Sequence, residues 1–83
     1  MKFRKQLGPK IRKFRIDREL TQEDLAALLG IHPTHVSNIE RGKSAPGSET
    51  VAKLIGALEI TPNELFDGIV WDAELGDFVE SDG

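Results

Sequence analysis

The segment from Leu20 to Gly42, LTQEDLAALLGIHPTHVSNIERG, contains two short helical patterns joined by one glycine. Thr21 is placed to cap the first helix, Gln22 to Leu29, because its hydroxyl can accept a hydrogen bond from the backbone of Asp24, whose carboxylate completes a capping box. Gly30 supplies the positive-φ residue that ends this helix after two turns. The helical spacing predicts one apolar face, made of Leu25, Ala26, Leu28 and Leu29.

The second helix of this segment is predicted over residues 33–41. His32 is its N-cap, and Pro33 takes the first helical position, where its missing N–H is no loss. Val36 and Ile39 are three residues apart and form the inward pair, and Gly42 ends the helix. The side chains left on the outside are Pro33, Thr34, His35, Ser37, Asn38 and Arg41.

These two helices resemble the helix-turn-helix of the phage repressor and Cro proteins, the Xre-like group of bacterial regulators. The resemblance extends to Gly8, Ile11 and Arg15 before the segment and to the helical patterns at 51–60 and 62–65 after it. It implies an all-α, five-helix repressor-like domain that binds double-stranded DNA. On this resemblance the protein regulates transcription, as a repressor, by reading the major groove with residues 33–41.

The other helices of the expected DNA-binding domain, residues 1–67, have local signals of their own. Gly8-Pro9 predicts the start of a helix that runs to Arg18. Ser48 is expected to cap a helix over 49–58, and Thr61 to Glu64 form a capping box for a short fifth helix.

The C-terminal tail, residues 68–83, predicts a short β-hairpin or an extended segment, because two apolar runs flank Glu74-Leu75-Gly76. A two-stranded ribbon is marginal alone in water, so its large apolar residues need to be covered. We expect them to join the tail of a second chain in a homodimer. The competing possibility is that the tail folds back onto the helices at 49–58 and 62–66. The residues concerned are Ile69, Trp71, Leu75 and Phe78.

Composition argues against several other classes of protein. The 83 residues suffice for one small domain, and without cysteine there is neither a disulfide framework nor a thiolate metal site. The longest apolar stretch is far shorter than the roughly 20 residues of a membrane span, and no apolar signal region follows the charged N-terminus. We therefore expect a cytoplasmic protein with no membrane partner, no metal and no cofactor.

Catalysis is not expected either. His32 and His35 are the only histidines, and neither a cysteine nor a neighbouring carboxylate completes a metal site with them. Two carboxylate pairs, Glu23 with Asp24 and Glu74 with Asp77, have no cleft of sufficient size around them.

The net charge of −3 is unevenly distributed along the chain. Residues 1–43 hold ten of the eleven Lys and Arg against five acids, whereas residues 44–83 hold Lys53 against nine acids. A basic half that carries the helix pair suits a molecule that docks on phosphates with one side. The acidic tail also suits an alternative, in which the same fold serves as an antitoxin or adaptor whose tail binds a protein partner.

The resemblance places Pro33, Thr34 and Asn38 of the second helix at base-facing positions, and Ser37 and His35 are weaker candidates beside them. Thr34 and Asn38 are the main candidates, because asparagine can bond adenine N6 and N7 together and a threonine methyl can pack on a thymine methyl. Ser37 and His35 could equally be solvated helix residues, and Pro33 has no donor and offers only an apolar contact. Phosphate contacts are expected from Gln22, His32, Arg41, Lys43 and Ser44.

Arg15 and Glu40 match positions at which the phage repressors form an ion pair between the first and third helices. The resemblance implies a structural ion pair here as well. The alternative is two unrelated surface charges, whose pairing would contribute about 0–1 kcal/mol.

Overall fold

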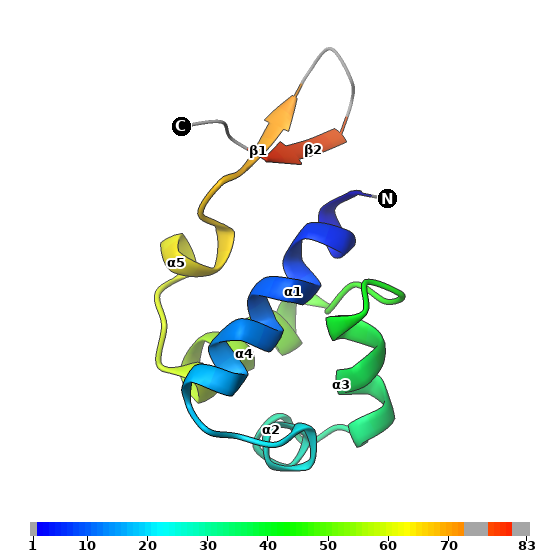
Figure 1. Ribbon diagram of the computed structural model, residues 1–83, viewed down its shortest axis with the longest axis vertical. Helices are drawn as coiled ribbons and strands as arrows, with labels where there is room; N and C mark the ends of the chain where they lie inside the picture. Colours follow the sequence, from blue (N-terminus) through cyan, green and yellow to red (C-terminus); the bar gives the residue numbers. More distant parts are fainter. Residues whose placement is uncertain (1, 73–76, 81–83) are drawn as a thin grey trace.

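The computed structural model describes residues 2–72 and 77–80 and has five helices followed by a β-hairpin (Figure 1). The hairpin stands beside the N-terminal half of the first helix, above the bundle in this view. The elements are α1 (Lys2–Asp17), α2 (Gln22–Leu29), α3 (Pro33–Glu40), α4 (Ser48–Leu58), α5 (Pro62–Phe66), β1 (Ile69–Asp72) and β2 (Asp77–Glu80).

The caps of α2 and α3 are those predicted from the sequence. The Thr21 hydroxyl accepts from the Asp24 N–H and the Asp24 carboxylate accepts from the Thr21 N–H, both at 3.0 Å. Gly30 ends α2 with φ of 70°, and the His32 ring nitrogen Nδ1 accepts from the Thr34 N–H at 3.1 Å. Because each signal is local, the boundaries of the helix pair follow from a few neighbouring residues.

The core lies where α1, α2, α3 and α4 meet. Leu28 is not part of it, contrary to the predicted apolar face of α2, because its side chain is 57% exposed. At 100° per residue, Leu28 lies about 100° from the middle of the buried stripe formed by Leu25, Ala26 and Leu29. The buried apolar residues are Leu7, Ile11, Leu25, Ala26, Leu29, Val36, Ile39, Leu54, Leu58, Ile60 and Leu65.

The first helix begins seven residues before the predicted start, and Pro9 lies inside it. Leu7 is fully buried, and burying a leucine side chain contributes about 1.5–3 kcal/mol. This gain is comparable to the roughly 3 kcal/mol that a proline costs inside a helix. Tertiary packing of Leu7 therefore offsets the cost of a proline inside the helix, and α1 continues before Pro9.

Two smaller differences concern α3 and α4. Arg41 is the C-cap of α3 and not its last residue. In α4, Gly47 is the N-cap and makes no side-chain cap, so Ser48 is the first helical residue and not the cap. The predicted capping box of α5 is confirmed, with Thr61 and Glu64 exchanging hydrogen bonds of 3.0 and 3.1 Å.

Two glutamates hold left-handed backbone conformations where helices end. Glu19 follows α1 with φ of 57°, and Glu59 follows α4 with φ of 54°. Arg18 joins these two corners, because its guanidinium donates to the carbonyl oxygens of Leu58 at 2.8 Å and Glu59 at 3.0 Å. The end of α1 is thereby fixed to the end of α4.

The hairpin predicted for the tail is present, with β1 and β2 antiparallel and the backbones of Trp71 and Phe78 paired. Its main helical neighbour among the described elements is α1, beside β2, whereas the competing expectation placed the tail on α4 and α5. Ile69 is partly buried and packs against the core of its own chain. Leu75 lies outside the described residues. None of the described helices is long and apolar enough to span a membrane.

Candidate nucleic-acid interface

Five residues of α3, four of them polar, lie on its outward side, which we call the α3 outer face. Val36 and Ile39 are 1% and 2% exposed and hold the opposite side of the helix in the core. The eight residues of α3 extend about 12 Å, and the major groove, about 12 Å wide, admits a helix of this kind. The face consists of Pro33, Thr34, His35, Ser37 and Asn38, all exposed or half-buried.

The end of α3 fixes the start of the following loop. Gly42 has φ of 75°, and the Asn38 carbonyl oxygen accepts from the backbone N–H groups of Lys43 at 2.9 Å and Ser44 at 3.3 Å. A second contact involves side chains, because Arg41 Nη2 donates to Asn38 Oδ1 at 3.1 Å. This contact was not predicted from the sequence, where Arg41 and Asn38 have separate roles, although their i, i+3 spacing allows it.

A buried polar network lies behind this face and joins three elements. Arg15 Nε donates to Glu40 Oε2 at 2.6 Å and its Nη2 to Glu40 Oε1 at 3.1 Å, so the ion pair between α1 and α3 is bidentate. The Arg15 and Glu40 side chains are only 11% and 2% exposed. The remaining terminal nitrogen of Arg15, Nη1, donates to the Leu20 carbonyl at 2.8 Å, just before α2.

Gln22 connects this network to the surface. It is the first residue of α2, it is half-buried, and its Nε2 donates to Glu40 Oε1 at 3.2 Å. A side-chain amide nitrogen carries two hydrogens, so one remains after this bond. Gln22 can therefore contact the end of α3 and an outside acceptor at the same time.

Gly8 brings the backbone of α1 against the last carbonyl groups of α3. A Cβ atom at this position would lie 2.5 Å from the Ile39 oxygen and 2.6 Å from the Glu40 oxygen. Only glycine permits this approach. The requirement explains why Gly8 is present, and it differs from the helix-start role that the sequence suggested.

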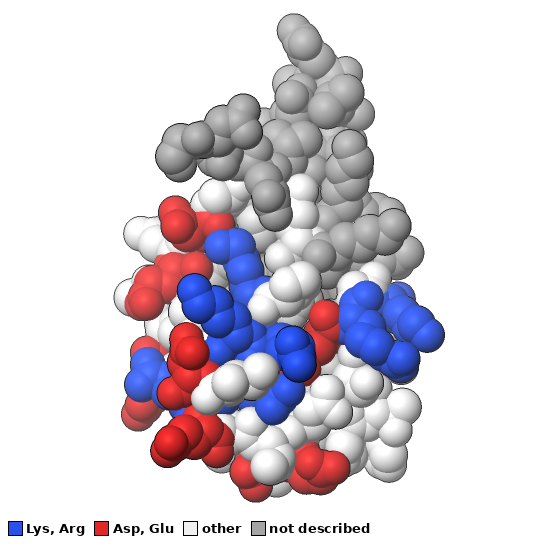
Figure 2. All heavy atoms as spheres, viewed as in Figure 1, with Lys and Arg blue, Asp and Glu red and all other residues white. Residues whose placement is uncertain are grey.

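Basic side chains gather around this part of the molecule. Figure 2 shows Lys and Arg over α1 and at the right edge beside the upper end of α3, whereas Asp and Glu cluster mainly along the left and lower edges. Arg41 and Lys43, at the end of α3, are both exposed, and Ser44 beside them is half-buried. The described surface thus has positive charge adjacent to the α3 outer face.

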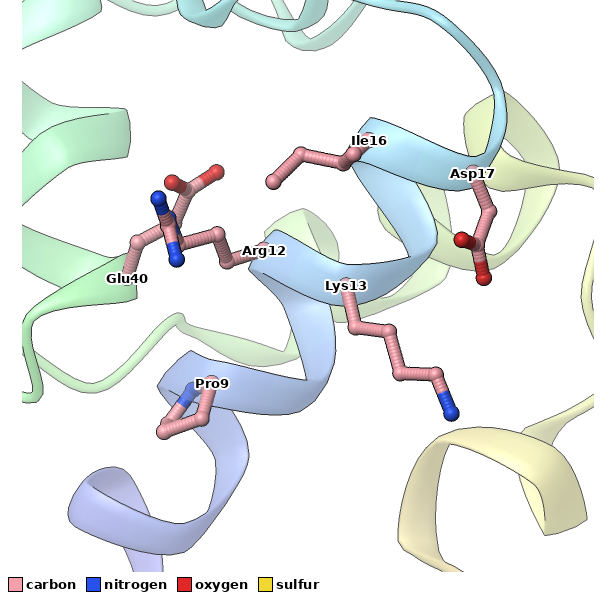
Figure 3. Close-up of a pocket in the computed structure, with 6 residues that line it drawn as sticks. All are labelled: Pro9, Arg12, Lys13, Ile16, Asp17 and Glu40. Atoms are coloured by element: carbon pink, nitrogen blue, oxygen red, sulfur yellow. The ribbon is translucent and has the colours of Figure 1, made fainter.

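An open pocket of about 440 Å³ lies next to the ion pair, lined by α1 residues and Glu40. Figure 3 shows the Arg12 side chain extending toward Glu40, while the Lys13 side chain points toward α5. Arg12 is a further cation beside the network and was not among the sequence-predicted site residues. The lining residues are Pro9, Arg12, Lys13, Ile16, Asp17 and Glu40.

Of the carboxylates considered for catalysis, one has a structural role and Glu74 lies outside the described residues. Asp24 is engaged in the cap of α2, and the hydrogen bond from the Thr21 backbone, followed by that with the Thr21 side chain, lowers its pKa. Within residues 2–72 and 77–80, no three His, Cys, Asp or Glu side chains gather as a metal site would require.

Known proteins with the same organisation place the chain in a family. The helix-turn-helix family model matches residues 11–65. The control protein C.BamHI of Bacillus amyloliquefaciens is 34% identical over 61 residues, which cover 72% of this chain and 75% of that protein. The transcriptional regulator DdrOP3 of Deinococcus deserti is 32% identical over 63 residues, 76% of this chain and 49% of that protein.

A solved structure agrees with this assignment. The crystal structure of the restriction-modification controller protein C.AhdI from Aeromonas hydrophila has a TM-score of 0.74 and 35% sequence identity, over 80% of this chain and 100% of that chain. The chain therefore belongs to the helix-turn-helix family of DNA-binding transcriptional regulators, and it is not an enzyme.

Proposed function

We propose that this protein is a repressor that binds a specific operator in double-stranded DNA as a homodimer. The observation that carries the proposal is the α3 outer face together with the polar groups beside it. Gln22, at the start of α2, bonds Glu40 at the end of α3, and the exposed Arg41 and Lys43 follow directly after α3. In this proposal these groups hold the sugar-phosphate backbone while the α3 outer face reads the bases.

Base recognition is assigned to the α3 outer face. Asn38 offers a carboxamide that can bond adenine N6 and N7 together, and Thr34 is exposed with both a methyl and a hydroxyl group. His35 and Ser37 are half-buried and are proposed as supporting contacts. Pro33 offers an apolar contact only.

Phosphate contacts are assigned to five residues at the edges of that face. Gln22 would donate its second amide hydrogen, and Arg41 and Lys43 their charged groups. His32 uses Nδ1 as the cap acceptor, which leaves the Nε2–H of the neutral ring as its donor. Ser44 would contribute its hydroxyl.

Dimerisation is assigned to the C-terminal hairpin. One α3 reads only a few base pairs, whereas a twofold dimer reads two half-sites about 34 Å apart. A two-stranded sheet has unpaired outer edges to which the same element of a second chain can add. Trp71 and Phe78 are the residues proposed for the contact, with Leu75 in the connecting segment. Ile69 has a smaller part, because it packs on its own core.

The relatives suggest a setting for this activity. Two curated proteins similar to this chain are control proteins, and C.AhdI is named as a restriction-modification controller. We propose that this protein likewise acts in the cytoplasm on a small set of promoters. A reporter fused to the selected operator should fall in output when the protein is expressed, and a rise would contradict repression.

Selection of duplexes from a random pool tests the central proposal. We expect one inverted-repeat motif. Its binding constant should fall with salt at a log-log slope of about −5 if six phosphates are engaged, at roughly −0.9 per phosphate. Failure to enrich any duplex at low salt, or a binding constant insensitive to salt, would contradict the proposal.

Truncation after Asp67 tests the dimer element. We expect the shortened chain to keep its helical circular dichroism, to sediment as a monomer and to lose most operator affinity. A truncated chain that stays dimeric, or a full-length chain that sediments as a monomer at micromolar concentration, would exclude the hairpin as the dimer contact.

A further inference from the structure

We infer that Arg41 is a positioning residue for base recognition, because it fixes which way the carboxamide of Asn38 faces. The inference rests on the proposed function, in which Asn38 reads a base. It gives Arg41 a second role besides its phosphate contact. On the DNA, the group recognised is the hydrogen-bonding edge of one adenine in each half-site.

The chemistry of the contact determines the orientation of the amide. Arg41 Nη2 lies 3.1 Å from Asn38 Oδ1. A guanidinium has five N–H donors and no acceptor, so it can bond the oxygen of a carboxamide and never its nitrogen. Rotation about the last bond of asparagine is otherwise broad and roughly twofold, which would exchange donor and acceptor.

The backbone holds the two residues in a fixed relation. Asn38 carries the carbonyl that accepts from Lys43 and Ser44, and the Arg41 N–H donates to the Ser37 carbonyl at 3.0 Å. Gly42, with φ of 75°, follows Arg41 and turns the chain so that the N–H groups of Lys43 and Ser44 reach the Asn38 carbonyl. Both side chains of the Arg41 to Asn38 contact therefore start from a fixed backbone, and only rotations within the side chains are needed to form it.

The fixed orientation of the Asn38 amide matches the donor and acceptor that adenine presents. Adenine presents N6–H₂ as a donor and N7 as an acceptor, so Asn38 must offer Oδ1 to the first and Nδ2–H to the second. A carboxamide oxygen has two lone pairs, one of which remains for adenine when Arg41 takes the other. A rotated amide would place Asn38 Nδ2–H against the N6–H₂ donor of adenine, and the protein's preference for adenine would fall.

The test compares binding of four operator duplexes that differ only in the base pair facing Asn38, using the full-length chain. A bidentate pair should give the wild-type protein a preference for adenine of about 5- to 150-fold. Arg41→Met, which removes every donor, should lower that preference by about 2- to 12-fold, the value of one hydrogen bond. It should also weaken binding to all four duplexes through the lost phosphate contact.

Three further variants separate positioning from charge. Arg41→Lys keeps a side chain with donors only, so the preference for adenine should be largely retained, together with the affinity. Lys43→Met is the matched control, since Lys43 has the neighbouring charge and no side-chain bond to Asn38; it should weaken all four duplexes equally. In the Asn38→Ala background, Arg41→Met should leave base preference unchanged.

The outcomes distinguish this inference from the proposed function. Wild-type protein that binds no duplex selectively contradicts the proposed function. Selective wild-type protein whose preference survives Arg41→Met, with affinity lost equally for all four duplexes as in Lys43→Met, overturns the positioning role alone. Circular dichroism of each variant verifies that α3 is intact.

Discussion

Replacing one partner of the ion pair between Arg15 and Glu40 should destabilise the fold far more than replacing both. In Arg15→Met the Glu40 carboxylate, whose side chain is 2% exposed, keeps only the Gln22 amide as a donor. In Glu40→Met the guanidinium keeps only the Leu20 carbonyl. The double variant leaves no uncompensated charge, so its penalty is mainly lost hydrogen bonds.

The burial of the pair sets the expected magnitude. Removing one partner of a buried ion pair costs about 3–5 kcal/mol, whereas replacing the whole pair by apolar side chains is often nearly neutral. A domain of this size has a total stability of about 4–12 kcal/mol. Each single variant should therefore melt at least about 12 °C below wild type, and the double variant should recover much of that loss.

Urea unfolding followed by far-ultraviolet circular dichroism measures the coupling. With a slope of about 1 kcal/mol per molar urea, a loss of 3 kcal/mol moves the midpoint by about 3 M. If Glu40→Met is too unstable to fold, Glu40→Gln, which keeps an acceptor for Arg15, can replace it in the double-mutant cycle. We expect a coupling energy of at least about 2 kcal/mol.

The exposed pair of Glu49 and Lys53 on α4 is the matched control. Its charged atoms are 3.3 Å apart, but the side chains are 85% and 48% exposed. The same cycle there should give about 0.3–0.5 kcal/mol. If the Arg15 and Glu40 cycle is additive to within about 0.5 kcal/mol, like this control, the ion pair does not join α1 to α3 in solution.

Three other predictions concern backbone and caps. Gly8→Ala should lower the urea midpoint clearly, because the new methyl meets two carbonyl oxygens of α3 at about 2.5 Å; an unchanged midpoint would mean that α1 does not approach α3 so closely. Glu19→Gly should raise the free energy of unfolding by about 0.5–1 kcal/mol, since glycine relieves a left-handed residue at φ of 57°, and a loss of stability would contradict this. Asp24 has a pKa lowered from its ordinary 3.8, so its carboxylate stabilises the fold above that pH and ceases to do so as pH falls through the lower folded value. The stability difference between wild type and Asp24→Asn should therefore be constant near neutral pH and shrink below pH 3.8, and a difference independent of pH would refute the cap.

The features predicted correctly are those encoded by residues close together in sequence. The capping boxes that begin with Thr21 and Thr61 each depend on a residue three positions later, and Gly30 sets its own backbone angle. The His32 cap of α3 depends on a residue two positions later. Such contacts need no knowledge of how the helices pack.

Several of the features that were missed depend on contacts between elements, although the bond from Arg41 to Asn38 is local. The part of α1 before Pro9 is accompanied by the burial of Leu7, whose packing against the other helices offsets the cost of the proline. The bond from Gln22 to Glu40 joins residues 18 positions apart and exists only once α2 and α3 have docked. The family resemblance implied which charges pair, but the bidentate geometry and the third partner required the structure.

The close approach at Gly8 also limits how this protein could acquire a new operator. Because the backbone of α1 lies against the final carbonyl groups of α3, the reading helix cannot slide or tilt along its axis without moving α1 as well. In the proposed function, in which Thr34 and Asn38 read bases, a change of base preference must then come from exchanging such side chains on a helix of unchanged position. Paralogues that keep a glycine at this position should accordingly differ in the bases that they recognise and dock on DNA with the same geometry.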